Sequence, residues 1–169
     1  GETLAPHLIR PAIEDELNYF NHKVWELSTI DEMKQVPDYI LVRSRWVICN
    51  KGDADKPDVR RRLVSCELNQ GDRNDNVSER HRVGKPLRIS FIEIRKAYFN
   101  AIPERAIYMR LPKEMGLPTD TVARQVRCVY GTRDAGKLWE DTYTLVMEDL
   151  GFKAGESNPC IFWNEARQL

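Results

Sequence analysis

The sequence predicts an α+β fold, because two kinds of periodicity occur along one chain. Near the N-terminus, apolar side chains recur every three or four residues, which is typical of an amphipathic helix. They are Ile13, Leu17, Phe20 and Val24. Further along, two segments rich in Val, Ile and Leu flank a polar turn, which is typical of a β-hairpin. A second helical pattern near the C-terminus completes the mixture.

The first half is expected to hold one helix and the hairpin. Pro11 suits the first turn of the helix, because its missing N–H would be unpaired there anyway. Residues 40–48 and 59–68 are the expected strands, with turn chemistry at 51–57. Residues 70–84 have almost no apolar content and are expected to form a loop.

The second half is expected to continue with strands and helices. Residues 87–94 are predicted to form a buried strand, followed by a short helical stretch at 95–101 and a strand at 107–111. A long helix should begin near Asp134, with Gly151 where a C-terminal cap belongs. The spacing of four side chains predicts a buried stripe on that helix: Trp139, Tyr143, Val146 and Leu150.

Composition narrows the possible functions. The 169 residues are 41% hydrophobic, which is enough for one domain with a core, and 26 Lys and Arg balance 26 Asp and Glu. Nucleic-acid contacts must therefore be local. The four cysteines form no C-x-x-C pair, and no apolar run approaches the roughly 18 residues of a membrane span. We expect an intracellular protein, cytoplasmic or nuclear, with no membrane partner.

One short pattern imitates a phosphate-binding loop. Residues 131–137 read GTRDAGK, which matches G-x-x-x-x-G-K before the expected long helix. In a P-loop the next residue is Ser or Thr, whose hydroxyl holds Mg²⁺, whereas here it is Leu138. Nucleotide binding by a P-loop is therefore the weakest functional hypothesis, and a turn before a helix is favoured.

Arginines and one glutamate are the other candidates. Alternation places Arg60 and Arg62 on one strand face and Arg61 on the other. Guanidinium groups bind phosphate well, but an ordinary solvated strand has the same spacing. Glu93 lies in the apolar run 91–94, where a carboxylate must be paired, hold a cation or face solvent. The residues alone leave these alternatives open.

Several segments, read in order, resemble the reverse transcriptases of copia-type retrotransposons. The matches run from about Ile13 to Trp163, with the family pattern given in brackets. They are residues 25–27 (W-E-L), 45–47 (K-W-V), 60–64 (K-A-R-L-V), 93–100 (D-V-K-T-A-F-L-N), 107–112 (I-Y-M-x-x-P), 129–139 (L-Y-G-L-K-Q-A-P-R-Q-W), 150–152 (L-G-F) and 156–160 (E-S-D-P-C).

The resemblance implies a fold, an activity and partners. Residues 1–83 would be a fingers-like segment with an N-terminal helix and a β-hairpin, and 84–169 part of the palm. Together they would form one incomplete, truncated domain of a Gag-Pol polyprotein. The implied activity is RNA-directed DNA polymerisation, which is nucleotidyl transfer by two Mg²⁺ ions. RNA template, DNA primer, deoxynucleoside triphosphates and the rest of the polyprotein are the implied partners.

The resemblance also assigns roles to residues. Glu93 stands where the palm has its first metal-binding Asp, so it is the candidate catalytic residue and Mg²⁺ ligand. Tyr98 stands at the aromatic position that excludes a ribose 2′-hydroxyl, and Arg60 and Arg62 stand at the positions that hold the incoming triphosphate. Nucleic-acid contacts are expected from three further arginines: Arg43, Arg45 and Arg133.

Departures from the family pattern predict that the isolated chain is inactive. Glu93 replaces Asp and displaces the carboxylate by about one bond length, where catalytic geometry tolerates roughly 0.5 Å. Asp134 replaces Gln and would face phosphate. No two aspartates are adjacent in the sequence, so the paired Asp motif is missing. The alternative function is a non-catalytic nucleic-acid-binding remnant.

Overall fold

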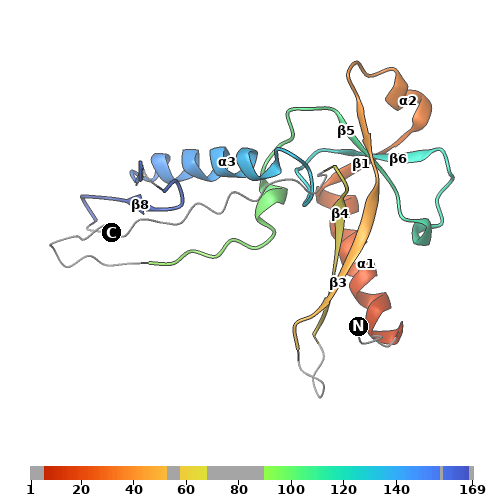
Figure 1. Ribbon diagram of the computed structural model, residues 1–169, viewed down its shortest axis with the longest axis horizontal. Helices are drawn as coiled ribbons and strands as arrows, with labels where there is room; N and C mark the ends of the chain where they lie inside the picture. Colours follow the sequence, from red (N-terminus) through yellow and green to blue (C-terminus); the bar gives the residue numbers. More distant parts are fainter. Residues whose placement is uncertain (1–5, 53–57, 68–89, 157, 168–169) are drawn as a thin grey trace.

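Helices and sheets are mixed along the chain, which confirms the α+β class. The computed structural model describes residues 6–52, 58–67, 90–156 and 158–167. One sheet has four strands, and Figure 1 shows three of them, β1, β5 and β6, at one end, with a hairpin of β3 (Ser44–Asn50) and β4 (Val59–Ser65) beside helix α1 (Pro6–Lys23). Helix α3 (Ala135–Asp149) extends away from both as an arm.

Helix α1 begins earlier than predicted. Pro11 lies inside the helix, whereas Pro6 occupies its first position. The expectation applied the right rule to the wrong proline, because a proline at the first position loses no helical hydrogen bond. Pro11 lies in the second turn of the helix, where it lacks the N–H that would donate one turn back and its ring crowds that carbonyl.

The four-stranded sheet contains two strands that the sequence did not reveal. Its order is β1 (Trp25–Thr29), β6 (Thr121–Gln125), β5 (Ile107–Arg110) and β2 (Ile40–Val42), with only β2 and β5 parallel. Only β2 and β5 were expected. A short helix, α2 (Ile30–Lys34), follows β1 and begins with a capping box of Thr29 and Glu32.

The strand expected at 40–48 is divided at Arg43 between two sheets. β2 joins the four-stranded sheet, and β3 pairs antiparallel with β4. The Arg43 carbonyl accepts a hydrogen bond from the Cys66 amide at 2.8 Å, so it remains paired at the division. The turn of the hairpin at 53–57 lies outside the described residues, as does the loop expected at 70–84.

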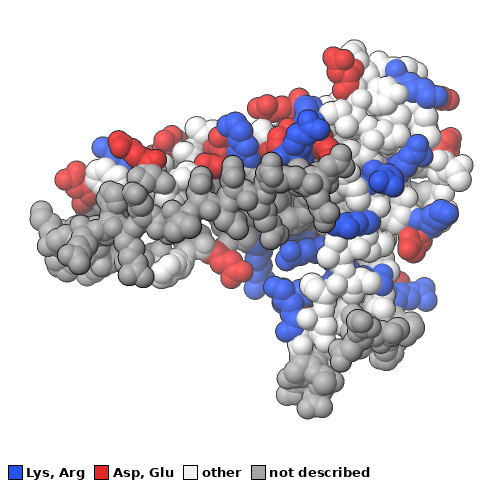
Figure 2. Space-filling view, in the orientation of Figure 1, with Lys and Arg blue, Asp and Glu red and all other residues white. Residues whose placement is uncertain are grey.

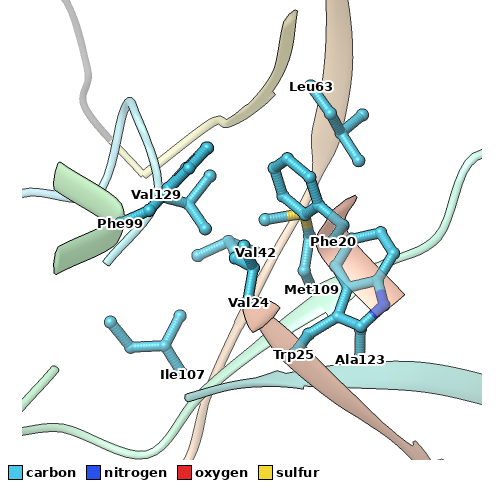
Figure 3. Packing of buried hydrophobic residues seen from close by; sticks show 10 residues of the cluster. All are labelled: Phe20, Val24, Trp25, Val42, Leu63, Phe99, Ile107, Met109, Ala123 and Val129. Atoms are coloured by element: carbon cyan, nitrogen blue, oxygen red, sulfur yellow. The ribbon is translucent and has the colours of Figure 1, made fainter. Parts of the chain in front are cut away.

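An aromatic cluster between α1 and the sheet forms the main core (Figure 3). Phe20 packs edge-on against Trp25 and Phe99, at ring-centroid distances of 4.8 and 5.2 Å. Leu63 brings β4 to the same cluster, so the hairpin is anchored at its base. Each such buried side chain contributes about 1.5–3 kcal/mol. The complete burial of Phe20 confirms the apolar stripe expected on helix α1 at this residue.

The strand expected at 87–94 is wrong for its described part. Residues 90–94 have no strand partner among the described residues, and Phe91 is 95% exposed. An apolar run favours an extended backbone, but a β-strand also needs a neighbouring strand with which to form hydrogen bonds. The expected helical stretch is a 3₁₀ helix, η1 (Ala97–Asn100). A second 3₁₀ helix, η2 (Lys113–Met115), follows β5.

Lys96 anchors η1 to helix α1. Its φ of 54° is unusual for a residue with a side chain. The Lys96 ammonium pairs with Glu16 at 3.0 Å and lies 3.6 Å from the centre of the Tyr19 ring. These contacts offset the backbone cost and fix the start of the helix that carries Tyr98.

Helix α3 is where it was predicted, but its predicted stripe is half-buried at Trp139 and Tyr143 and exposed further along. Gly151 has φ 82°, and it and Phe152 donate amide hydrogen bonds that close the helix end, which confirms the predicted cap. Val146 and Leu150, however, are 54% and 51% exposed. The helix packs mainly through its first turn and through the small strands β7 (Lys153–Ala154) and β8 (Phe162–Trp163). Its far half has no second layer to cover it in the described part of the chain.

A close approach of two main chains explains Gly131. A Cβ placed on Gly131 would lie 2.0 Å from the Ser65 carbonyl oxygen, and its φ is 88°. The Ser65 amide also donates to the Tyr130 carbonyl at 2.7 Å. The end of β4 therefore rests directly on the turn that precedes α3.

Replacing Gly131 with Ala should destabilise the fold by at least about 3 kcal/mol, because it adds both a backbone clash and a left-handed φ. The matched control is Gly116→Ala, which shares a left-handed φ of 63° but meets no atom within 4 Å. Its cost should be about 1 kcal/mol. Urea unfolding would measure both. Equal losses for the two variants would show that β4 does not approach Gly131 closely.

Candidate nucleic-acid interface

Three arginines share the outward face of the hairpin. Exposure alternates along β4, so Arg60 and Arg62 are exposed while Arg61 turns toward the ring of Trp46. On β3, the strand register places Arg45 on the same face, opposite Val64. Asp58 pairs with Arg60 at 3.0 Å, which partly offsets one of the three charges. The face therefore presents a local positive charge on a chain with no net charge.

Arg62 also lies against a pair of tyrosines whose rings are in contact, tilted by 43°. Its guanidinium carbon is 5.3 Å from the centre of the Tyr130 ring, and Tyr130 packs on Tyr98 at 4.8 Å. Burial raises the pKa of Tyr130, so its phenol stays neutral at physiological pH. A planar cation held on an aromatic ring, with further arginines along the same strand face, forms a surface suited to phosphate groups.

The sequence did not indicate the role of Tyr130. It lies in a matched segment, but nothing in its spacing relates it to Arg62, which is on another element. Tyr98 and Arg62 were both candidates, and Tyr130 lies between them. The signal that could have found it is the aromatic residue immediately before the Gly131 turn.

The other two arginine candidates lie elsewhere. Arg43 is exposed at the division between β2 and β3, and its carbonyl is engaged by Cys66. Arg133 is exposed before α3, and its backbone amide donates to Glu67 at 2.9 Å. Neither guanidinium has an ion pair among the described residues.

Arg105 joins three segments through two carboxylates. It donates two hydrogen bonds to Glu67, after β4, and two to Asp134, before α3. The Asp134 bonds are 2.8 and 2.9 Å long. The Glu67 side chain is only 6% exposed. Asp134 was expected to face nucleic-acid phosphate, but its charge is instead held by Arg105.

The pKa values of both carboxyl groups are lowered by this arrangement. Burial acts to raise the pKa of Glu67, but hydrogen bonds from Arg105 and from the Arg133 amide outweigh it. Hydrogen bonds from Arg105 lower the pKa of Asp134. Both groups are thus charged at neutral pH, and the Arg105 clamp, meaning Arg105 with Glu67 and Asp134, is fully formed there.

Glu93 is not part of a metal site in the described residues. Its side chain is exposed in the extended segment at 90–94. No three His, Cys, Asp or Glu side chains in the described part of the chain are grouped so that they could hold a metal ion. The donor set that two Mg²⁺ ions require is therefore not assembled by these residues.

The loop that resembles a P-loop serves a different purpose here. Gly131 is required by the close approach of Ser65, and Lys137 pairs with Asp141 on its own helix at 3.0 Å. At the start of α3, the carboxylates of Glu67 and Asp134 lie where a P-loop would receive phosphate. Negative charge at this position opposes the binding of a polyphosphate.

No protein-family model matches the chain, and no solved structure matches it significantly. Among the described helices, none has the length and apolar character needed to cross a membrane.

Replacing Arg105 with Ala should destabilise the fold by about 2–3 kcal/mol. The loss for a fully buried pair is about 3–5 kcal/mol, and this guanidinium is partly exposed. The control is Lys137→Met, which removes an exposed pair on α3 and should have a much smaller effect. Chemical denaturation would compare the two variants, and equal losses would contradict a structural role for the Arg105 clamp.

The effect of Arg105→Ala should also depend on pH. A lowered carboxyl pKa contributes stability above the ordinary value of about 4, and this contribution is lost as pH falls through the lowered pKa. The stability difference between the unmodified chain and the variant should thus be full at pH 7 and narrow on acidification below about 4. Denaturation curves across this range would measure it, and a constant difference would refute the ionic contribution.

Proposed function

We propose that the chain is the fingers and the first part of the palm of a copia-type reverse transcriptase. In this proposal its parent function is RNA-directed DNA polymerisation within a Gag-Pol polyprotein. The chain itself contributes a surface for nucleic acid and nucleotide. The ordered series of sequence matches supports the family, and the surface around Arg62 supports the binding role.

The single observation that carries the proposal is the contact of Arg62 with Tyr130 and of Tyr130 with Tyr98. The family resemblance separately assigned Arg62 to the triphosphate and Tyr98 to the sugar of the same nucleotide. These residues are far apart in the sequence, and a contact through one ring is what a shared ligand would require. Arg60 and Arg45 extend the positive charge from this point along the hairpin.

The proposal also states that the isolated chain does not polymerise DNA. Two-metal transfer needs carboxylates that hold both ions about 3.5–4 Å apart. Glu93 is exposed, and the described residues offer no cluster of ligands beside it. Nucleic-acid binding without catalysis is therefore the activity that we assign to the chain alone, and Mg²⁺ is not required for it.

Replacing both Arg60 and Arg62 with Ala should weaken binding of an RNA–DNA duplex and lower the slope of log K against log salt by about one or two. A matched control removes two arginines from the four-stranded sheet, Arg110 and Arg124, both exposed. That control should leave the slope unchanged. Fluorescence anisotropy over a range of salt would measure it. Equal slopes for the two double variants would exclude the hairpin as the binding surface.

The unmodified chain should not extend a DNA primer on an RNA template in the presence of Mg²⁺. Glu93→Asp should not restore extension, because one carboxylate does not hold two ions. A primer-extension assay beside an active reverse transcriptase provides the measurement. Extension that disappears in Glu93→Gln would overturn the proposal of an inactive chain while leaving the binding role intact.

A further inference from the structure

An open groove lies between helix α3 and the segment that follows η1. It has a volume of about 500 Å³, and none of its lining residues belongs to the strands β3 and β4 that carry the arginine face. Leu138, Thr142 and Leu145 line it from the helix, at spacings of four and three that place them on one side. Ile102 and Pro103 line it from the other wall.

The groove is apolar at its walls, yet it is open to solvent. Ile102 is 65% exposed and Leu145 is 64% exposed. Leucine and isoleucine side chains that face each other across a groove gain free energy when an apolar partner covers them. The buried core beneath this part of the chain is small, with Ala101, Cys128 and Ala135 fully buried and Leu138 packed against them.

Both charged residues that line the groove are acidic. Asp141 forms an ion pair with Lys137 on the same helix, but Glu104 has no cation within ion-pair distance in the described residues. Figure 2 shows further acidic side chains along the arm that α3 forms. Glu140, Glu148 and Asp149 belong to that helix, whose one described cation is Lys137. The field at the groove is therefore negative.

We propose that this groove binds a short amphipathic helix of a partner protein, with an apolar stripe flanked by Lys or Arg. The wall from Leu138 to Leu145 spans two helical turns, or about 10 Å, which suits two or three turns of a bound helix. Apolar side chains of the partner cover Ile102 and Leu145. Its basic residues meet Glu104 and the acidic side of α3, which excludes acidic helices of the same shape.

The test uses two fluorescent synthetic peptides of about 14 residues, long enough to form a helix on binding. Both carry Leu at helical positions i, i+3, i+4 and i+7, and they differ only in having Lys or Glu at the flanking positions. Anisotropy titrations with the full chain should show at least tenfold tighter binding of the Lys peptide. Equal affinities, or no binding of the Lys peptide, would overturn the proposal.

Variants of the chain locate the binding surface. Leu145→Ser should weaken the Lys peptide about tenfold, whereas Val146→Ser, also exposed on α3 but outside the groove, should change its affinity less than twofold. Glu104→Lys should reduce the preference for the Lys peptide. Circular dichroism checks that each variant is folded. Equal effects of Leu145→Ser and Val146→Ser would overturn the assignment to the groove.

Sedimentation of the chain alone distinguishes a partner helix from a second copy. The proposal expects a monomer across the concentrations used for the titrations. A dimer that is abolished by Leu145→Ser would show that a second copy occupies the groove, and it would overturn the partner helix. None of these measurements involves nucleic acid, so their outcome is independent of the proposed function.

Discussion

One guanidinium group joins the end of the hairpin, the segment after η1 and the start of α3. Arg105 lies between the end of the hairpin and the start of α3, and it satisfies a nearly buried carboxylate on one side and an acidic residue on the other. The direct contact of Ser65 with Gly131 lies beside it. The arm formed by α3 has a small core of its own against η1, and these polar contacts add to it in positioning the helix relative to the hairpin.

Local patterns predicted the elements that depend on neighbours in sequence. The hairpin, helix α3 and the cap at Gly151 all follow from spacing and turn chemistry within a few residues. Strands β1 and β6 did not follow, because each is short and is stabilised by the other across about a hundred residues of chain. The Arg105 contacts span 38 and 29 residues, and charged side chains at such separations leave no periodic signal.

The same distinction between local patterns and distant contacts applies to the candidate site. Alternation along β4 indicated which arginines share a face, because side-chain direction in a strand depends only on the strand itself. The position of Glu93 depended on a strand partner that the described residues do not supply. An acidic residue in an apolar run therefore does not by itself indicate a buried carboxylate. The contact of Tyr130 with Arg62 required the folded arrangement of three elements.

Because one predicted strand is divided at Arg43 between two sheets, the hairpin can bend at its base as a unit. β3 leaves the four-stranded sheet at this residue, and β4 returns to the body at Ser65 and Cys66, whose amides bond to Tyr130 and Arg43. The pivot at the base of the hairpin is thus held by two separate main-chain hydrogen bonds, because Cys66 joins the end of β4 to Arg43 before β3 and Ser65 joins it to Tyr130. A seven-residue strand is about 23 Å long, so a rotation of about 5° at this pivot displaces the far end by about 2 Å. Arg60 lies near the far end of β4 and Arg62 at its middle, so bending would change the spacing between their charges and the tyrosines without breaking a strand.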